Sequence, residues 1–126
     1  MFKNRKSLRA GFTLVEIMIV VLIIGILLAI AIPNFIRARE QGRAKACSAN
    51  LKQIQSALQQ YAMDQKMAAG AAVADWHTLI GSTGYIKSTP ACPSNGSYTA
   101  TNIDNDPTCS YGTTGGSSFN HAINGL

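Results

Sequence analysis

"GFTLVEIMIVVLIIGILLAIAIPNFIRARE" is the sequence of residues 11–40, and it decides the fold of this 126-residue chain. The 20 residues from Ile17 to Ile36 carry no charge. As an α-helix they would rise by about 30 Å, which is the thickness of the hydrocarbon core of a bilayer. Glu16 stands just before them, and a carboxylate inside a membrane costs about 2.5–3.5 kcal/mol. The stretch therefore predicts a membrane-spanning helix whose carboxylate needs a partner.

The positive charge of the chain is concentrated before this helix. The chain has 11 basic and 6 acidic residues, for a net charge of +5. Four of the basic residues precede Gly11, namely Lys3, Arg5, Lys6 and Arg9. Without this leader, seven basic residues face six acidic ones. The high isoelectric point is therefore no argument for nucleic-acid binding.

Three interpretations of the apolar stretch compete. A secretory signal peptide would be cut after Ala31, in the small-x-small sequence Ala29-Ile30-Ala31, but the apolar run is longer than a usual signal core and would lie beside Glu16. A simple membrane anchor does not explain the energetic cost of the Glu16 carboxylate. A cut between Gly11 and Phe12 would create an amine four residues before Glu16, on the same face of a helix. That amine could neutralise the carboxylate within one chain or between neighbouring chains.

The residues of this region resemble the N-terminus of type IV pilins and pseudopilins. The resemblance covers residues 3–62 and includes the basic leader, the Gly11-Phe12 step, Thr13-Leu14, Glu16 and the Pro-Asn step at Pro33. It implies that a prepilin peptidase cuts after Gly11 and N-methylates Phe12. It implies that Glu16 pairs with the Phe12 amine of a neighbouring subunit during assembly, and that the leader stays cytoplasmic.

Two residues mark weak points of the helix. Pro33 lacks an amide donor and should kink or locally open the helix around residues 29–33. In the pilin interpretation, Gly25 and Pro33 bracket a stretch that loosens when the helix packs into a fibre.

Beyond Pro33 the pattern predicts that the helix continues with one apolar face. Apolar residues follow at spacings of three and four, and polar residues occupy the other face. We place the helix end near Lys66, because Gly70 and an alanine-rich stretch follow. The apolar stripe comprises Cys47, Leu51, Ile54, Leu58 and Tyr61.

Four basic residues follow the apolar stretch closely. We interpret these residues as contacts to lipid headgroups before assembly, and to solvent or ion-pair partners afterwards. A DNA-binding strip is less favoured, because no aromatic residues are interleaved and no groove-reading motif is present. They are Arg37, Arg39, Arg43 and Lys45.

The polar second half predicts a small sheet. Asp75 can cap a short helix that contains Trp76 and ends at Gly81. The segment Asp104-Asn105-Asp106 is interpreted as a turn and not as a calcium site. His77 and His121 show no metal-ligand spacing, so no metal site is predicted. The expected strands are 85–87, 97–103 and 108–111, and Phe119 or Ile123 should attach the last stretch to the sheet.

The chain has three cysteines, at positions 47, 92 and 109. An exported domain with two cysteines in a loop-rich tail is typical of a disulfide-bonded protein. The tail also resembles that of short pilins, in which Cys-Pro-x-x-Gly-x-Tyr precedes a second cysteine, and this resemblance favours a Cys92–Cys109 bond worth roughly 3 kcal/mol. Cys47 is expected to be a buried hydrophobe, with a bond to one tail cysteine as the alternative.

These observations predict an α+β protein with a long N-terminal helix packed in its second half on a small antiparallel sheet. The expected parts are a removed leader (1–11), a transmembrane and assembly segment (12–36), an amphipathic helix (37–66) and a small polar globular part (67–126). No nucleophile–base pair, phosphate loop or cofactor motif appears, so neither an enzyme nor a cofactor is expected.

The predicted function is that of a structural pilin, held in the bilayer and then extracted into a homo-oligomeric helical filament by an inner-membrane assembly machinery. Twitching motility, adhesion or DNA uptake would be the downstream role. A pseudopilin of a type II secretion system is the first alternative. A secreted binding module cut after Ala31 is the alternative of another class.

Overall fold

The structure is a computed structural model, and it describes residues 10–82, 84–114 and 121–123. The chain divides into an N-terminal unit, residues 1–37, and a C-terminal unit, residues 38–126. The elements in chain order are helix α1 (Leu14–Asp64), the single-turn helix η1 (Trp76–Leu79), strands β1 (Tyr98–Thr99) and β2 (Thr108–Cys109), and helix α2 (Ser110–Thr114). The predicted α+β class, with a long N-terminal helix and a small antiparallel sheet, is confirmed.

Helix α1 includes both predicted weak points. Gly25 and Pro33 lie inside its bounds, and the helix is continuous through them in the single chain. Loosening of this segment concerns packing in a fibre, so it stays a prediction.

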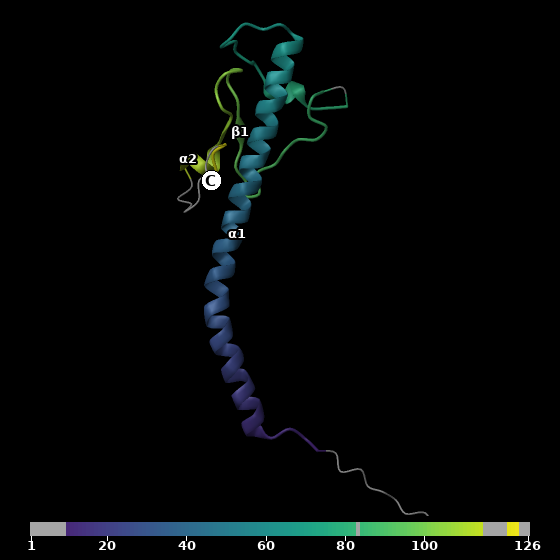
Figure 1. The fold of residues 1–126 in the computed structure, drawn as a ribbon. Coiled ribbons are helices and arrows are strands. Elements are labelled where there is room, and N and C mark those ends of the chain that lie inside the picture. Colours follow the sequence, from purple (N-terminus) through teal and green to yellow (C-terminus); the bar gives the residue numbers. More distant parts are fainter. Residues whose placement is uncertain (1–9, 83, 115–120, 124–126) are drawn as a thin grey trace, which may run out of the picture. The chain divides into compact units, whose positions relative to one another are not determined.

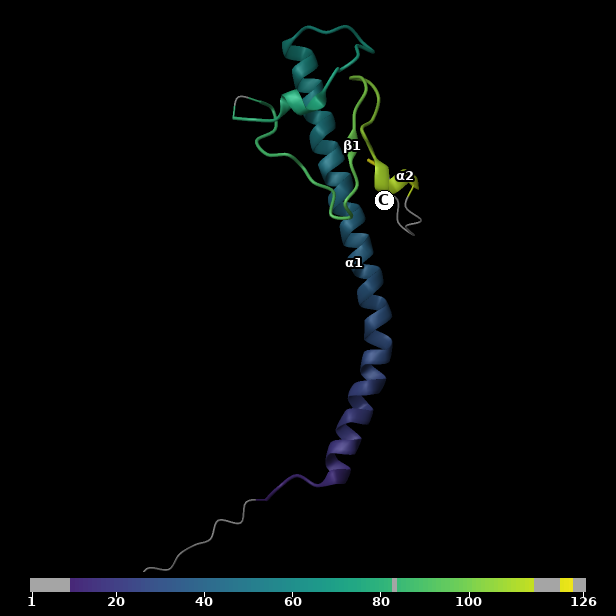
Figure 2. The same cartoon turned by 180° about the vertical axis from the view of Figure 1, so that it is seen from behind.

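The core of the C-terminal unit forms around one face of α1. Its buried residues recur at spacings of one, three and four, which places them on a single stripe. The predicted stripe is confirmed, with Tyr61 half-buried at its end. In both views of the molecule the later segments run alongside this part of α1 (Figures 1 and 2). The buried stripe consists of Ala44, Cys47, Ser48, Leu51, Ile54, Ala57 and Leu58.

A capping motif ends α1 close to the predicted position. Lys66 adopts a left-handed conformation with a φ of 51°. Its amide donates to the Met63 carbonyl at 3.2 Å, and the Met67 amide donates to the Ala62 carbonyl at 3.0 Å. This pair of bonds is a Schellman motif, which satisfies carbonyls that the helix leaves free at its end.

Asp75 caps η1, as the sequence predicts. Its carboxylate accepts a 2.9 Å hydrogen bond from the His77 amide and lies 2.7 Å from His77 Nδ1. These two bonds lower the pKa of Asp75. The Trp76 side chain is buried in the core, so its predicted role as a core anchor is confirmed.

The sheet is smaller than predicted. Strands β1 and β2 pair antiparallel, with Tyr98 opposite Cys109 and Thr99 opposite Thr108. The predicted strand 97–103 contributes only two strand residues and a bridge from Asn102 to Ala72. The prediction of a strand at 85–87 was wrong, because Ile86 makes a single parallel bridge to Ile80. These segments are rich in Ser, Thr, Asn and Gly, and their backbone groups bond to turns instead of a long ladder.

The chain turns into a helix where the third predicted strand was expected to continue. Ser110 and Tyr111 begin α2, so only the first two residues of the predicted strand 108–111 lie in β2. Ile123 is buried in the core, and its carbonyl accepts a 3.0 Å hydrogen bond from Ser48 Oγ of α1. Phe119 lies outside the described residues.

Gly96 and Gly42 offer opposite tests of this packing. A Cβ at position 96 would lie 2.6 Å from Cys109 Sγ and 2.9 Å from Tyr111 Cβ, whereas a Cβ at position 42 would meet nothing within 4 Å. We expect Gly96→Ala to lower the free energy of unfolding by about 1–3 kcal/mol through overpacking. Gly42→Ala should raise it by about 0.5–1 kcal/mol, because alanine is the better helix former.

Urea unfolding of the full chain in detergent, followed by the fluorescence of the one tryptophan, Trp76, measures both changes. Equal stability of the two variants would contradict the packing around Gly96.

Candidate assembly surface and thiol cluster

The start of α1 is capped by Thr13. The Glu16 amide donates a 3.2 Å hydrogen bond to Thr13 Oγ1, and the Ile17 amide donates to the Thr13 carbonyl at 3.3 Å. Thr13 is thus the N-cap and Glu16 the third helical residue, which is the spacing of a capping box. The sequence interpretation missed this role, although Thr-x-x-Glu before an apolar run is its signature.

Glu16 lies in the first turn of α1, and no basic side chain within the described residues forms an ion pair with it. A carboxylate there gains about 0.3–1 kcal/mol from the helix dipole. This gain is smaller than the 2.5–3.5 kcal/mol cost of the charge in a membrane. Helix capping alone therefore does not explain Glu16.

Phe12 lies outside the helix, because α1 begins at Leu14. The shared helical face that would bring a Phe12 amine to Glu16 within one chain is therefore not formed in this chain. Pairing of Glu16 with a Phe12 amine, within one chain or between neighbouring chains, stays a prediction.

The N-terminal unit presents an apolar surface on all sides. Every described residue from 10 to 39 is exposed, and the apolar side chains between Phe12 and Ile36 are 47–82% exposed. Among the described residues, one helix, α1, is long and apolar enough to cross a membrane. A helix that is apolar all round requires burial by lipid or by other protein.

In the C-terminal unit, the structure brings all three cysteines together. The Cys92 sulfur lies 3.9 Å from the Cys47 sulfur and 3.7 Å from the Cys109 sulfur, and all three sulfurs lie within 4.8 Å of one another. Cys47 comes from α1, Cys92 from the turn before β1 and Cys109 from β2. The side chains are at most 7% exposed.

Hydrogen-bond donors surround two of these sulfurs. The backbone amides of Ser94 and Gly96 bond to Cys92, and the Tyr98 hydroxyl bonds to Cys47. Burial raises the pKa of Cys47 to about 12. Burial acts to raise the pKa of Cys92, but the amides of Ser94 and Gly96 and the thiols of Cys109 and Cys47 together outweigh it, so the pKa of that thiol is lowered. The cluster therefore has a site suited to a thiolate at Cys92.

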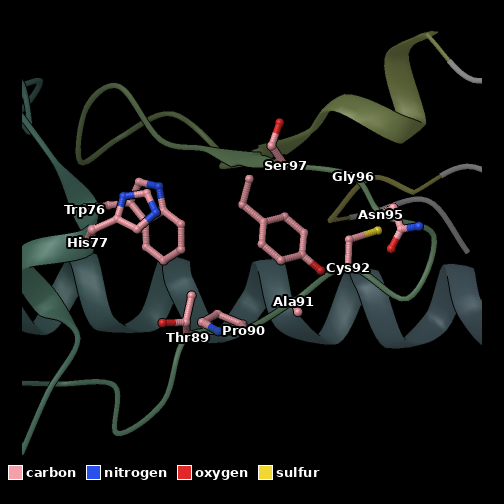
Figure 3. Close-up of a pocket in the computed structure, with 10 residues that line it drawn as sticks. Trp76, His77, Thr89, Pro90, Ala91, Cys92, Asn95, Gly96 and Ser97 are labelled. Carbon is pink, nitrogen blue, oxygen red and sulfur yellow. The ribbon is translucent and has the colours of Figure 1, made fainter.

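A cavity of about 440 Å³ reaches the cluster at Cys92 (Figure 3). Trp76 and His77 lie at one end of the cavity, and Cys92 and Asn95 lie at the other. Asn50 of α1 holds two residues that line the cavity, because its Nδ2 donates to the Ala91 carbonyl at 2.9 Å and to Tyr98 Oη at 3.0 Å. Cys92 is thus the thiol nearest to a route from solvent.

The predicted burial of Cys47 is confirmed. The three thiols are unbonded in the structure, and Cys92 lies at similar distances from both others. The Cys92–Cys109 bond therefore stays a prediction, as does the alternative with Cys47. Sequence spacing could not reveal that all three sulfurs meet.

One member of the basic group forms an ion pair. Arg43 Nη1 lies 3.4 Å from Glu40 Oε1, one helical turn away. Both side chains are one-third exposed, so the pair contributes at most about 1 kcal/mol.

Comparison with known proteins finds a family motif and several relatives. The prokaryotic N-terminal methylation motif matches residues 6–32. The type IV major pilin protein PilA of Myxococcus xanthus is 55% identical over 47 residues, which cover 37% of this chain and 21% of PilA. The type II secretion system core protein G of Pseudomonas aeruginosa is 39% identical over 56 residues, which cover 44% of this chain and 39% of that protein. No solved structure matches.

A third relative is matched over most of its length. The ComG operon protein 3 homolog of Bacillus licheniformis is 34% identical over 83 residues, covering 66% of this chain and 80% of that protein. The chain belongs to the family of type IV pilins and pseudopilins.

The cap at Thr13 can be tested separately from assembly. Thr13→Ala should remove the acceptor for the Glu16 amide and weaken the first turn of α1 by about 1 kcal/mol. We expect roughly fivefold faster hydrogen exchange at the amides of Glu16 and Ile17 in the full chain in detergent. Thr13→Ser keeps the hydroxyl and should leave the exchange rate unchanged, and equal rates in the two variants would argue against the cap.

Proposed function

We propose that this chain is the structural subunit of a type IV pilus and polymerises through residues 12–36 after removal of its leader. The observation that supports this is the apolar surface of the N-terminal unit, which is exposed on every side. Burying one Val, Leu or Ile side chain stabilises a complex by about 1.5–3 kcal/mol. Transfer of many such side chains into a filament core can offset the cost of leaving the bilayer.

Glu16 supplies selectivity in this scheme. A lone subunit leaves the carboxylate without a cationic partner, whereas the Phe12 amine of a neighbour would supply one after cleavage at Gly11. In a low-dielectric environment such a pair is strongly attractive, and breaking it by removing one partner costs several kcal/mol. The pairing therefore favours one axial register between neighbouring helices.

Processing and location follow from the same scheme. A prepilin peptidase would cut after Gly11 and methylate Phe12, with residues 1–11 in the cytoplasm. The C-terminal domain would lie outside the cytoplasmic membrane and then on the surface of the filament. Gly25 and Pro33 would allow the helix to loosen as it packs. Adhesion, twitching motility or DNA uptake would be the downstream role.

A pseudopilin of a secretion system is the second candidate. The similarity to the type II secretion system core protein G favours it, because that protein is 39% identical to this chain over 56 residues. The secreted-module alternative is less compatible with the fold, because Ala31 lies inside α1 and cleavage there would divide the helix.

The role of Glu16 generates a mutational prediction. Glu16→Ala should leave membrane insertion intact, because it removes a charge from the apolar segment. It should reduce incorporation into filaments at least tenfold, because the partner amine is left buried and unpaired. Sheared filaments and membranes from cells that carry the export machinery measure the two pools.

Glu40→Ala is the matched control, because it removes a carboxylate from the same helix outside residues 12–36. It should assemble like the unmodified chain. Normal filaments from Glu16→Ala would remove the proposed role of the carboxylate.

The N-terminus of the purified subunit tests processing directly. We expect N-methylated phenylalanine from position 12, identified by mass spectrometry of the first peptide. An N-terminus at Ile32 would establish the secreted module instead. Gly11→Leu should retain the leader, because it changes the residue before the cleaved bond.

A further inference from the structure

We propose that Cys47, Cys92 and Cys109 form a zinc site in the C-terminal unit, with His121 as the fourth ligand. The inference is independent of filament assembly, because every residue involved lies in the C-terminal unit.

The positions of the three sulfurs fit one small metal ion. With separations of 3.9 Å and 3.7 Å and a third within 4.8 Å, a point equidistant from the three sulfurs lies at most about 2.5 Å from each, and a zinc–sulfur bond is about 2.3 Å long. Tetrahedral ligands at that bond length are about 3.8 Å apart, and two of the observed separations are 3.7 Å and 3.9 Å.

The surroundings of the sulfurs also suit a bound metal. Amide and hydroxyl donors to the sulfurs of Cys92 and Cys47 would share the charge of metal-bound thiolates. The cavity beside Cys92 offers a route for the ion. Thiolates are soft ligands and select zinc over the hard cations calcium and magnesium.

His121 is the second, independent observation. Its side chain is 1% exposed, and neither ring nitrogen has a hydrogen-bond partner among the residues that the structure describes. Its carbonyl lies 3.8 Å from the Cys47 sulfur, which places the residue beside the cluster. The ring nitrogens do not belong to the group of mutually close ligand atoms, so coordination requires the His121 side chain to change its position. A metal bond would satisfy one of its two unpaired nitrogens.

The zinc site and the predicted Cys92–Cys109 disulfide exclude one another in the same molecule, since zinc binds thiolates. The mass of the full chain, purified in detergent without reductant, distinguishes them. We expect one zinc per chain and, after chelation, three free thiols. A chain that lacks zinc and has lost two hydrogens through a Cys92–Cys109 bond would overturn the proposal.

Reconstitution tests the ligands individually. The reduced, metal-free full chain should regain one zinc on addition of zinc chloride, and cobalt should give a sulfur-to-metal charge-transfer band. Each of Cys47→Ser, Cys92→Ser and Cys109→Ser should weaken zinc binding at least tenfold. Ile103→Val perturbs the same core without removing a sulfur and should bind zinc normally. Absence of the charge-transfer band in the unmodified chain would refute the site whether or not the serine variants fold.

The two histidines provide a matched pair for the fourth ligand. His121→Ala should weaken zinc binding and alter the visible cobalt spectrum while the sulfur band remains. His77→Ala removes the exposed histidine and should change neither. An unchanged cobalt spectrum in His121→Ala would refute the assignment of His121.

Discussion

A helix that is apolar on every side, with a single carboxylate in its first turn, is the constraint on which this protein depends. Nothing among the described residues covers the side chains of residues 12–36. Lipid tails can cover them, but lipid tails give no partner to Glu16. A neighbouring subunit with a free N-terminal amine can satisfy both requirements. Apolar burial supplies an association energy without direction, whereas a buried ion pair fixes which part of one helix meets which part of the next.

The second half of α1 obeys a different rule. From Ala44 onward, buried residues are confined to one stripe, and the polar face carries glutamine and lysine side chains. This stripe organises a small core with few regular strands, so turns and side-chain bonds hold the later segments against α1. Asn50 and Ser48 bond to the carbonyls of Ala91 and Ile123, which ties two loops to the helix. Such bonds satisfy backbone groups that a longer sheet would otherwise pair.

The sequence predicted what depends on local periodicity and missed what depends on tertiary contacts. The stripe from Cys47 to Leu58, the cap at Asp75 and the helix end near Lys66 follow from spacing and local residue type. The strand at 85–87 does not form, and the backbone of Ile86 is paired instead through a single parallel bridge to Ile80. The meeting of three sulfurs requires the register that places Tyr98 opposite Cys109, together with the turn at Cys92. Neither the strand register nor the turn at Cys92 can be predicted from the spacing of residues, because both depend on how the tail folds on α1.

The stability of the C-terminal unit depends on how many segments are linked at the thiols. A disulfide joins two positions, and a Cys92–Cys109 bond would close a loop within the tail without cross-linking that loop to α1. A metal held by Cys47, Cys92 and Cys109 would join α1, the turn before β1 and β2 at one point, and His121 would add the last described segment. A small core with a two-stranded sheet has little apolar area for its length, which is the circumstance in which a structural metal stabilises a fold most. Because the ligands come from α1, the turn before β1, β2 and the segment at His121, loss of the metal would loosen several segments of the core and not a single loop.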